Sequence, residues 1–155
     1  MLQVGDQAPA FTLFSSDKKE VKLEDYQGQN VVLLFFPMAF TSVCTAELCN
    51  MRDDIAFYQG LNAQILGISV DSPFTLAKFK EDQNLNFPLL SDFNKGVSTA
   101  YGALYQDFVF GMKGVSKRAA FVIDANGTIQ YAEVLENAGE MPNFANVKAA
   151  LAVLN

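Results

Sequence analysis

Residues 31–37 read Val31-Val32-Leu33-Leu34-Phe35-Phe36-Pro37, a continuous apolar run that ends at a proline. A run of this length without polar alternation is typical of a strand that is buried on both faces of a sheet. Even when it is extended to Phe40, the stretch is half the length of a membrane span and contains Pro37, so a membrane-spanning helix is excluded. The run therefore predicts a central strand of an α/β sheet.

Strands and helices alternate on both sides of this run. A polar stretch from Ser15 to Lys19 separates two short apolar segments and predicts a hairpin near the N-terminus. Ala119–Ile123 reads as another strong strand, and the turn residues Asp124–Gly127 lead it into the next. In chain order, the predicted elements are a hairpin at 11–14 and 20–23, a strand at 31–36, a helix from Thr41 or Ser42 to about Tyr58, a strand at 65–70, a helix from Pro73 to about Asp82, a short strand at 87–90, a short helix at 96–101, strands at 119–123 and 128–134, and a helix at 143–154.

This order predicts one α/β domain over residues 1–155. A β-α-β-α start, a variable middle and a β-β-α end are typical of the thioredoxin fold, in which helices flank a mixed central β-sheet. Here an N-terminal β-hairpin extends that fold. Half of the 155 residues are hydrophobic, including 14 phenylalanines, so the chain can bury a sizeable core. No internal repeat or linker divides the sequence.

Composition and charge exclude several classes of function. The net charge is −6 and there is no basic run, which disfavours binding to a nucleic-acid backbone. The chain has no histidine, which excludes Ser-His and Cys-His catalytic pairs and the commonest zinc ligand, so we expect neither a metal nor a cofactor. The first residues do not resemble a signal peptide, and two cysteines are too few for a disulfide scaffold. We therefore expect a cytoplasmic protein without a membrane or nucleic-acid partner.

Cys44 lies just beyond the central strand, in the first turn of the predicted helix. Ligands of open α/β sheets bind beyond the carboxyl ends of the strands. The free N–H groups and the dipole at the start of a helix favour a negative charge, and the thiolate is the nucleophilic form of cysteine. Thr41 comes three residues earlier, so its hydroxyl can lie beside the sulfur. The alternative is that Cys44 is a small buried hydrophobic residue and Thr41 a simple helix cap.

Cleavage of a peroxide bond requires a thiolate and donors that hold both oxygens. Backbone N–H groups near Cys44 could supply two donors, and a guanidinium could supply more. The chain has two arginines. Arg52 lies about 12 Å farther along the same predicted helix, which is too far. Arg118 precedes the strand 119–123 and reaches the site if that strand lies beside 31–36. Otherwise Arg118 is an exposed charge at the end of a strand.

Four segments extend this pattern over nearly the whole chain: Val4–Phe11, Pro37-x-x-x-Thr41-x-x-Cys44, Phe87–Asp92 and Arg118–Asp124. Together they resemble the peroxiredoxin family. The resemblance implies a thiol peroxidase that reduces hydrogen peroxide and organic hydroperoxides, with Cys44 as the peroxidatic residue that is oxidised to sulfenic acid. It also implies that Pro37 shields the site, that Thr41 and Arg118 orient the peroxide, and that Glu47 helps to order the site through an ion pair.

A second cysteine, Cys49, follows Cys44 by five residues. In an intact helix their Cα atoms would be roughly 8–9 Å apart, whereas a disulfide requires less than about 7 Å, so the first turns must unwind before the two can bond. This spacing resembles the Q-type, or bacterioferritin-comigratory, peroxiredoxins, in which such a cysteine resolves the sulfenic acid and thioredoxin or a similar dithiol reduces the disulfide. Residues 36–40 and 87–92 are closer to one-cysteine E-type members, in which an external thiol is the reductant. Both mechanisms stay open at this point.

Two other interpretations compete with a peroxidase. A thioredoxin-like disulfide exchanger usually has C-x-x-C spacing, but four residues separate Cys44 from Cys49. A non-catalytic binding module would be expected to lack Cys44, Thr41 or Arg118, and all three are present.

Predicted loops near the site carry large apolar side chains, among them Met38, Phe40, Phe108 and Phe110. They belong to the core, or they line a surface for substrate or for a second copy of the chain. The resemblance favours a homodimer built from loops beside the active site, although Q-type members also occur as monomers. Gly111–Lys117 reads as a mobile loop that leads to Arg118.

Overall fold

The computed structural model describes residues 2–154. A seven-stranded sheet has the order β2-β1-β5-β4-β3-β8-β9, and β6 and β7 form a separate pair. The strands are β1 (Thr12–Ser15), β2 (Glu20–Lys22), β3 (Asn30–Phe35), β4 (Ala63–Ser69), β5 (Leu89–Ser91), β6 (Leu104–Tyr105), β7 (Val115–Ser116), β8 (Ala119–Ile123) and β9 (Ile129–Val134). The helices are η1 (Leu23–Tyr26), α1 (Ser42–Asp53), α2 (Ile55–Gly60), α3 (Pro73–Gln83), α4 (Gly96–Ala100), η2 (Val109–Gly111) and α5 (Phe144–Val153).

Strand β3 lies inside the sheet, as its apolar run predicts. Every residue of β3 is buried. The strand runs parallel to β4 and antiparallel to β8, so the sheet is mixed, and the expected thioredoxin-like α/β fold is confirmed. Phe35 pairs with Ala119 in this register, and one more step along both chains brings Arg118 opposite Phe36. The sheet therefore delivers Arg118 to the end of β3, where the chain turns toward α1.

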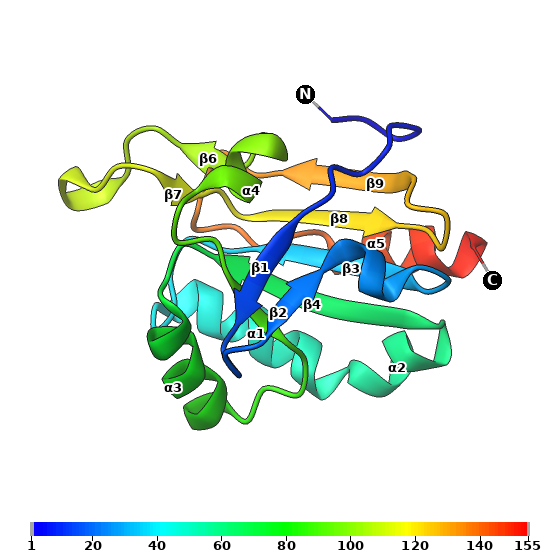
Figure 1. Cartoon of the computed structure of the whole chain (residues 1–155), viewed down its shortest axis with the longest axis horizontal. Helices are drawn as coiled ribbons and strands as arrows, with labels where there is room; N and C mark the ends of the chain where they lie inside the picture. The colour runs from blue at the N-terminus through cyan, green and yellow to red at the C-terminus, as the bar shows by residue number, and fades with distance from the viewer. Residues whose placement is uncertain (1, 155) are drawn as a thin grey trace.

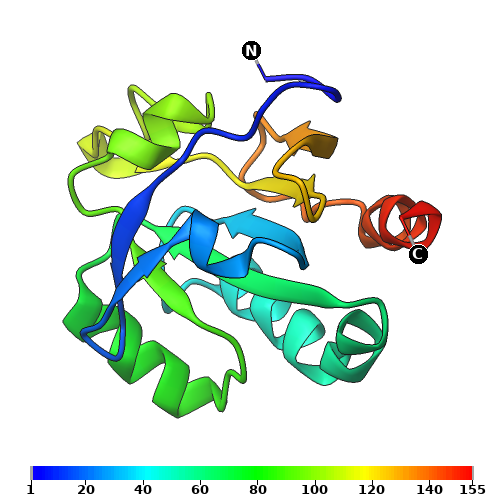
Figure 2. The ribbon, with the colours of Figure 1, turned by 45° about the vertical axis from the view of Figure 1, so that its right-hand side comes forward.

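Side chains of β3 alternate between the two faces of the sheet and join two different cores. Val32 and Leu34 pack with residues of α1, α3 and α5, whereas Leu33 and Phe35 pack with the N-terminal segment and with Tyr101 after α4. Figures 1 and 2 show this division, with α1, α2 and α3 on one side of the sheet and α4 on the other. The central strand is covered on both faces, which explains why its sequence has no polar alternation.

The remaining elements agree with the sequence in most places, but η1, β6 and η2 were not predicted, and two predictions are wrong in part. Ser72 caps α3 by accepting a hydrogen bond from the Thr75 N–H at 3.1 Å, with Pro73 as the first helical residue. The single helix predicted from 41 or 42 to about 58 is wrong in one respect, because it breaks at Asp54 into α1 and α2. The loop predicted at 111–117 is also wrong in part, since β7 within it pairs with β6. Within residues 2–154, no helix is both long enough and apolar enough to span a bilayer.

Candidate active site

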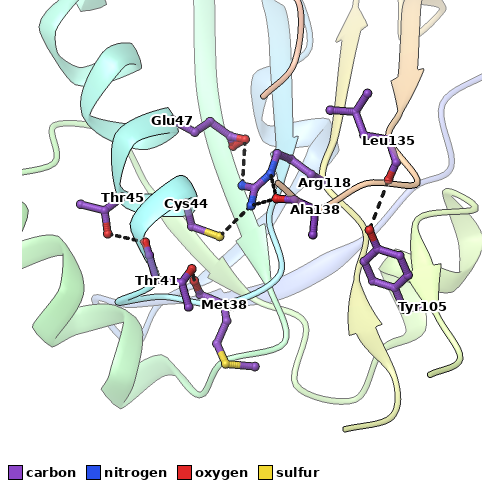
Figure 3. A network of polar contacts seen from close by, with 9 residues as sticks. All are labelled: Met38, Thr41, Cys44, Thr45, Glu47, Tyr105, Arg118, Leu135 and Ala138. Atoms are coloured by element: carbon purple, nitrogen blue, oxygen red, sulfur yellow. Dashed lines mark hydrogen bonds and ion pairs between the residues drawn. The ribbon is translucent and has the colours of Figure 1, made fainter. Parts of the chain in front are cut away.

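The Cys44 sulfur lies in the first turn of α1 and faces the guanidinium of Arg118 (Figure 3). Arg118 Nη2 is 3.2 Å from Cys44 Sγ. Both side chains are buried, with Cys44 1% and Arg118 2% exposed. A guanidinium at this distance favours negative charge on the sulfur, and burial reduces the screening of that attraction by water. The two residues that the sequence selected for the central chemistry therefore lie together.

Arg118 is held in place by a backbone carbonyl as well as by a carboxylate. Ala138 O accepts hydrogen bonds from Arg118 Nη2 at 2.8 Å and from Arg118 Nε at 3.2 Å (Figure 3). On another edge of the same guanidinium, Nη1 lies 3.4 Å from Glu47 Oε1. Because a guanidinium is planar, these contacts fix both its position and its tilt. Ala138 is a part of the site that sequence reasoning missed, since a main-chain carbonyl has no residue signature.

Glu47 is fully buried one turn of α1 beyond Cys44. Its Oε1 faces Arg118, and its Oε2 has no hydrogen-bond partner within the described residues 2–154. Burial raises the pKa of this carboxyl from 4.5 to about 8, although the positive charge of Arg118 acts in the opposite direction. The expected ion pair is therefore present in geometry, while burial favours the protonated form of the Glu47 carboxyl.

Thr41 occupies the N-cap position of α1, but its hydroxyl does not cap the helix. Thr41 Oγ1 donates a hydrogen bond to Met38 O at 2.8 Å, back along the loop between β3 and α1 (Figure 3). The expected contact between this hydroxyl and the sulfur is therefore not formed in this conformation. Thr41 is exposed and Pro37, in the same loop, is buried. Rotation of the exposed Thr41 side chain would free its hydroxyl for a ligand.

Cys49 belongs to the same helix but points toward a different neighbour. Its thiol donates to Gln83 Oε1 at 3.4 Å, whereas the Cys44 sulfur meets Arg118. Both cysteines are free, and α1 is continuous through both positions. Arg52 donates to Gln83 O at 2.5 Å and pairs with Asp53, so it does not serve the Cys44 site. The intact helix keeps the two thiols apart.

The arrangement can perform nucleophilic chemistry on a small electrophile. A buried sulfur has a cation beside it and lies at a helix start, where the first N–H groups lack intrahelical acceptors. Arg118 and the first N–H groups of α1 are donors of the kind that can hold an incoming oxygen beside the sulfur. Such a site stabilises an anion on sulfur before the reaction and on the leaving oxygen during it.

Comparisons with known proteins agree with this chemistry. Residues 4–132 match the AhpC/TSA family. A putative peroxiredoxin of Mycobacterium tuberculosis is 42% identical over 134 residues, which are 85% of each chain. Alkyl hydroperoxide reductase E of Mycobacterium bovis is 38% identical over 157 residues, which are 99% of each chain. The crystal structure of peroxidoxin BcpB from Mycobacterium tuberculosis superposes with a TM-score of 0.88 at 28% identity and covers 100% of this chain and 99% of the other.

Proposed function

Because this chain belongs to the AhpC/TSA family and is a thiol-dependent peroxidase of the peroxiredoxin type, we propose that Cys44 is its peroxidatic residue. The substrates would be hydrogen peroxide and organic hydroperoxides. The observation that carries the proposal is the distance of 3.2 Å between Arg118 Nη2 and Cys44 Sγ inside a buried site. Arg118 is the cation that favours the thiolate and holds the peroxide.

In the first step the Cys44 thiolate attacks one oxygen of the peroxide. A sulfur–oxygen bond forms, the O–O bond breaks, and its electron pair passes to the other oxygen, which takes up a proton and leaves as water or an alcohol. Sulfur is thereby oxidised to sulfenic acid. Arg118 and the first N–H groups of α1 stabilise the developing charge. Thr41 turns from Met38 O to the bound peroxide, and Pro37 shields the reacting atoms.

Glu47 has a supporting role in this proposal. Its carboxyl lies against the guanidinium and is too deeply buried to meet solvent. Together with Ala138 O, it holds the guanidinium so that Nη2 lies beside the sulfur. Glu47 therefore orders the site without touching the peroxide.

Cys49 is the second thiol of the proposed cycle. After the first turns of α1 unwind, its sulfur attacks the sulfenic acid, a disulfide forms and water leaves. Thioredoxin or a similar dithiol then reduces the disulfide. Cys49 is half-buried and is the only other cysteine of the chain. The alternative remains a one-cysteine cycle in which an external thiol reduces the sulfenic acid directly.

Single-turnover oxidation separates these steps. Reduced protein is mixed with one equivalent of hydrogen peroxide, and thiol loss and mass are followed in the wild type and in Cys44→Ser and Cys49→Ser variants. We expect oxidation within seconds in the wild type and in Cys49→Ser, but not in Cys44→Ser. A wild type that reacts only as slowly as Cys44→Ser would refute the proposal. Unchanged steady-state turnover with thioredoxin in Cys49→Ser would remove Cys49 from the mechanism and select the external thiol.

A homodimer through loops beside the site is part of the same proposal. The loop that contains η2 lies beside residues 136–139, which include the Ala138 carbonyl. Phe110 in that loop is 96% exposed, and Phe40 in the loop before α1 is 51% exposed. Exposed rings of this size favour burial against a second chain. Sedimentation of the reduced protein tests this association.

Because the cycle depends on free thiols, we propose the cytoplasm as its compartment.

A further inference from the structure

Asp71 joins the loop that precedes Cys44 to the end of the neighbouring strand. Its Oδ2 accepts a hydrogen bond from the Ala39 N–H at 2.8 Å and another from Ser69 Oγ at 2.7 Å. Ala39 lies in the middle of the loop between β3 and α1, whereas Ser69 is the last residue of β4. The carboxylate thus bridges two segments that are 32 positions apart in sequence.

Asp71 is itself fixed by main-chain contacts. Its N–H donates to Ser69 Oγ at 3.2 Å, and its carbonyl accepts from Ser91 Oγ at 2.6 Å. Both serines are buried, at the carboxyl ends of β4 and β5. Because β3, β4 and β5 are parallel neighbours, these contacts bring the ends of β4 and β5 and the loop after β3 together around Asp71. The position of Asp71 is therefore set by the rigid sheet.

The loop from 36 to 41 needs such an anchor. Phe40 has a φ of 67°, a left-handed conformation that is strained for a residue with a Cβ. Within the loop, the hydroxyl of Thr41 donates to Met38 O, so the two residues that flank Ala39 and Phe40 are tied to each other. The bond from Ala39 to Asp71 connects this tight turn to the sheet.

We propose that Asp71 is a positioning residue for peroxide reduction, which holds the loop 37–41, and with it Pro37 and Thr41, in place before the start of α1. This inference rests on the proposed function. Asp71 does not touch the peroxide. If the Asp71 carboxylate is removed, the Ala39 N–H loses its acceptor, and the loop is no longer connected to the end of β4. The thiolate and Arg118 stay in place, but the groups that orient the peroxide do not.

The test compares Asp71→Ala, Asp71→Asn and the matched control Asp107→Ala. Asp107 is an exposed carboxylate in the loop on the other side of the site, with Lys113 as its ion-pair partner. We expect Asp71→Ala to lower the second-order rate constant for oxidation by hydrogen peroxide about tenfold or more, because displacement by about 1 Å suffices for such a loss. Asp71→Asn keeps an oxygen that accepts from Ala39 and should stay within about threefold of the wild type. Asp107→Ala should react like the wild type.

A second measurement separates positioning from a general structural effect. Alkylation of Cys44 by iodoacetamide needs the thiolate but not the peroxide-orienting loop, so Asp71→Ala should be alkylated at least as fast as the wild type. Oxidation of Asp71→Ala at the wild-type rate would overturn the inference, as would equal losses in the two reactions or an Asp71→Asn variant as slow as Asp71→Ala. A Cys44→Ser variant that consumes peroxide as fast as the wild type would instead refute the proposed function.

Discussion

Replacement of Glu47 by glutamine should change how the stability of the protein depends on pH. The Glu47 side chain is fully buried, and burial raises the pKa of its carboxyl from 4.5 to about 8. Because the chain has no histidine, few other groups titrate between pH 5 and pH 8. This window therefore reports mainly on one carboxyl.

The sign and size of the effect follow from proton linkage. The pKa of Glu47 is higher in the folded state than in the unfolded state, so in this window the folded protein holds a proton that the unfolded chain has released. The resulting contribution to stability is complete below the unfolded value of 4.5 and is lost as the pH rises through about 8. The slope is about −1.4 kcal/mol per pH unit, so the wild type should lose about 2–3 kcal/mol relative to Glu47→Gln between pH 5 and pH 7.

Urea unfolding at pH 5, 6 and 7 measures this difference. Both proteins should carry Cys44→Ser, which prevents oxidation of the neighbouring thiol. We expect the free energy of unfolding of the protein that retains Glu47 to fall with pH relative to that of the Glu47→Gln variant, because glutamine does not titrate. Two curves that run parallel from pH 5 to pH 7 would show that the folded protein holds Glu47 ionised throughout. The conclusion that burial raises the pKa of Glu47 would then be wrong.

Three further substitutions test contacts in and around the sheet. Arg118→Lys should slow oxidation of the peroxidatic thiol by about 10- to 100-fold in stopped-flow measurements, since an ammonium cannot keep the contacts of a planar guanidinium. A wild-type rate would contradict this role. Gly67→Ala would place a Cβ 2.7 Å from Leu89 Cδ2 and should lower the free energy of unfolding by about 1–3 kcal/mol. An unchanged urea midpoint would show that the Leu89 side chain shifts to accommodate the added methyl group at little cost. Ser72→Ala removes the acceptor of the Thr75 N–H and should cost about 1 kcal/mol in the same assay. Equal stability would mean that another group caps α3.

Much of the site follows from the sequence because it depends on strand order and helix position. A continuous apolar run of this length that ends at a proline indicates a strand covered on both faces, and the residues after such a strand reach the ligand-binding edge of the sheet. Cys44 therefore lies where its distance from the run predicts. The prediction that Arg118 reaches the site depended on pairing of its strand with β3, and the observed register between β3 and β8 shows this pairing. The roles of these residues in the reaction stay predictions until the variants are measured.

Other features could not be predicted because they depend on main-chain atoms or on contacts distant in sequence. Any residue at position 138 presents the same carbonyl to Arg118, so nothing in the sequence marks Ala138. The bond between Asp71 and Ala39 joins two loops whose approach is set by the parallel pairing of β3 with β4. The break at Asp54, where φ is −111° and ψ is 14°, interrupts a pattern of apolar residues that continues across it. Local sequence alone gives no reason to divide that helix.

The two ends of helix α1 make different contacts with the rest of the protein, and this difference would allow the disulfide between Cys44 and Cys49 that we propose. Its last turn is anchored to α3, because Arg52 donates to Gln83 O. Cys49 faces the same residue and would stay with the anchored half while the turns around Cys44 unwind. The main apolar cost of that unwinding is exposure of Leu48, which is fully buried, at about 2–3 kcal/mol. This cost alone would limit the open form to about one molecule in a hundred, since each 1.4 kcal/mol is a factor of ten. In the proposed cycle, the first step needs the closed helix and the second needs the open one, so the sulfenic acid would wait inside the site and would be exposed to a second peroxide in proportion to the peroxide concentration.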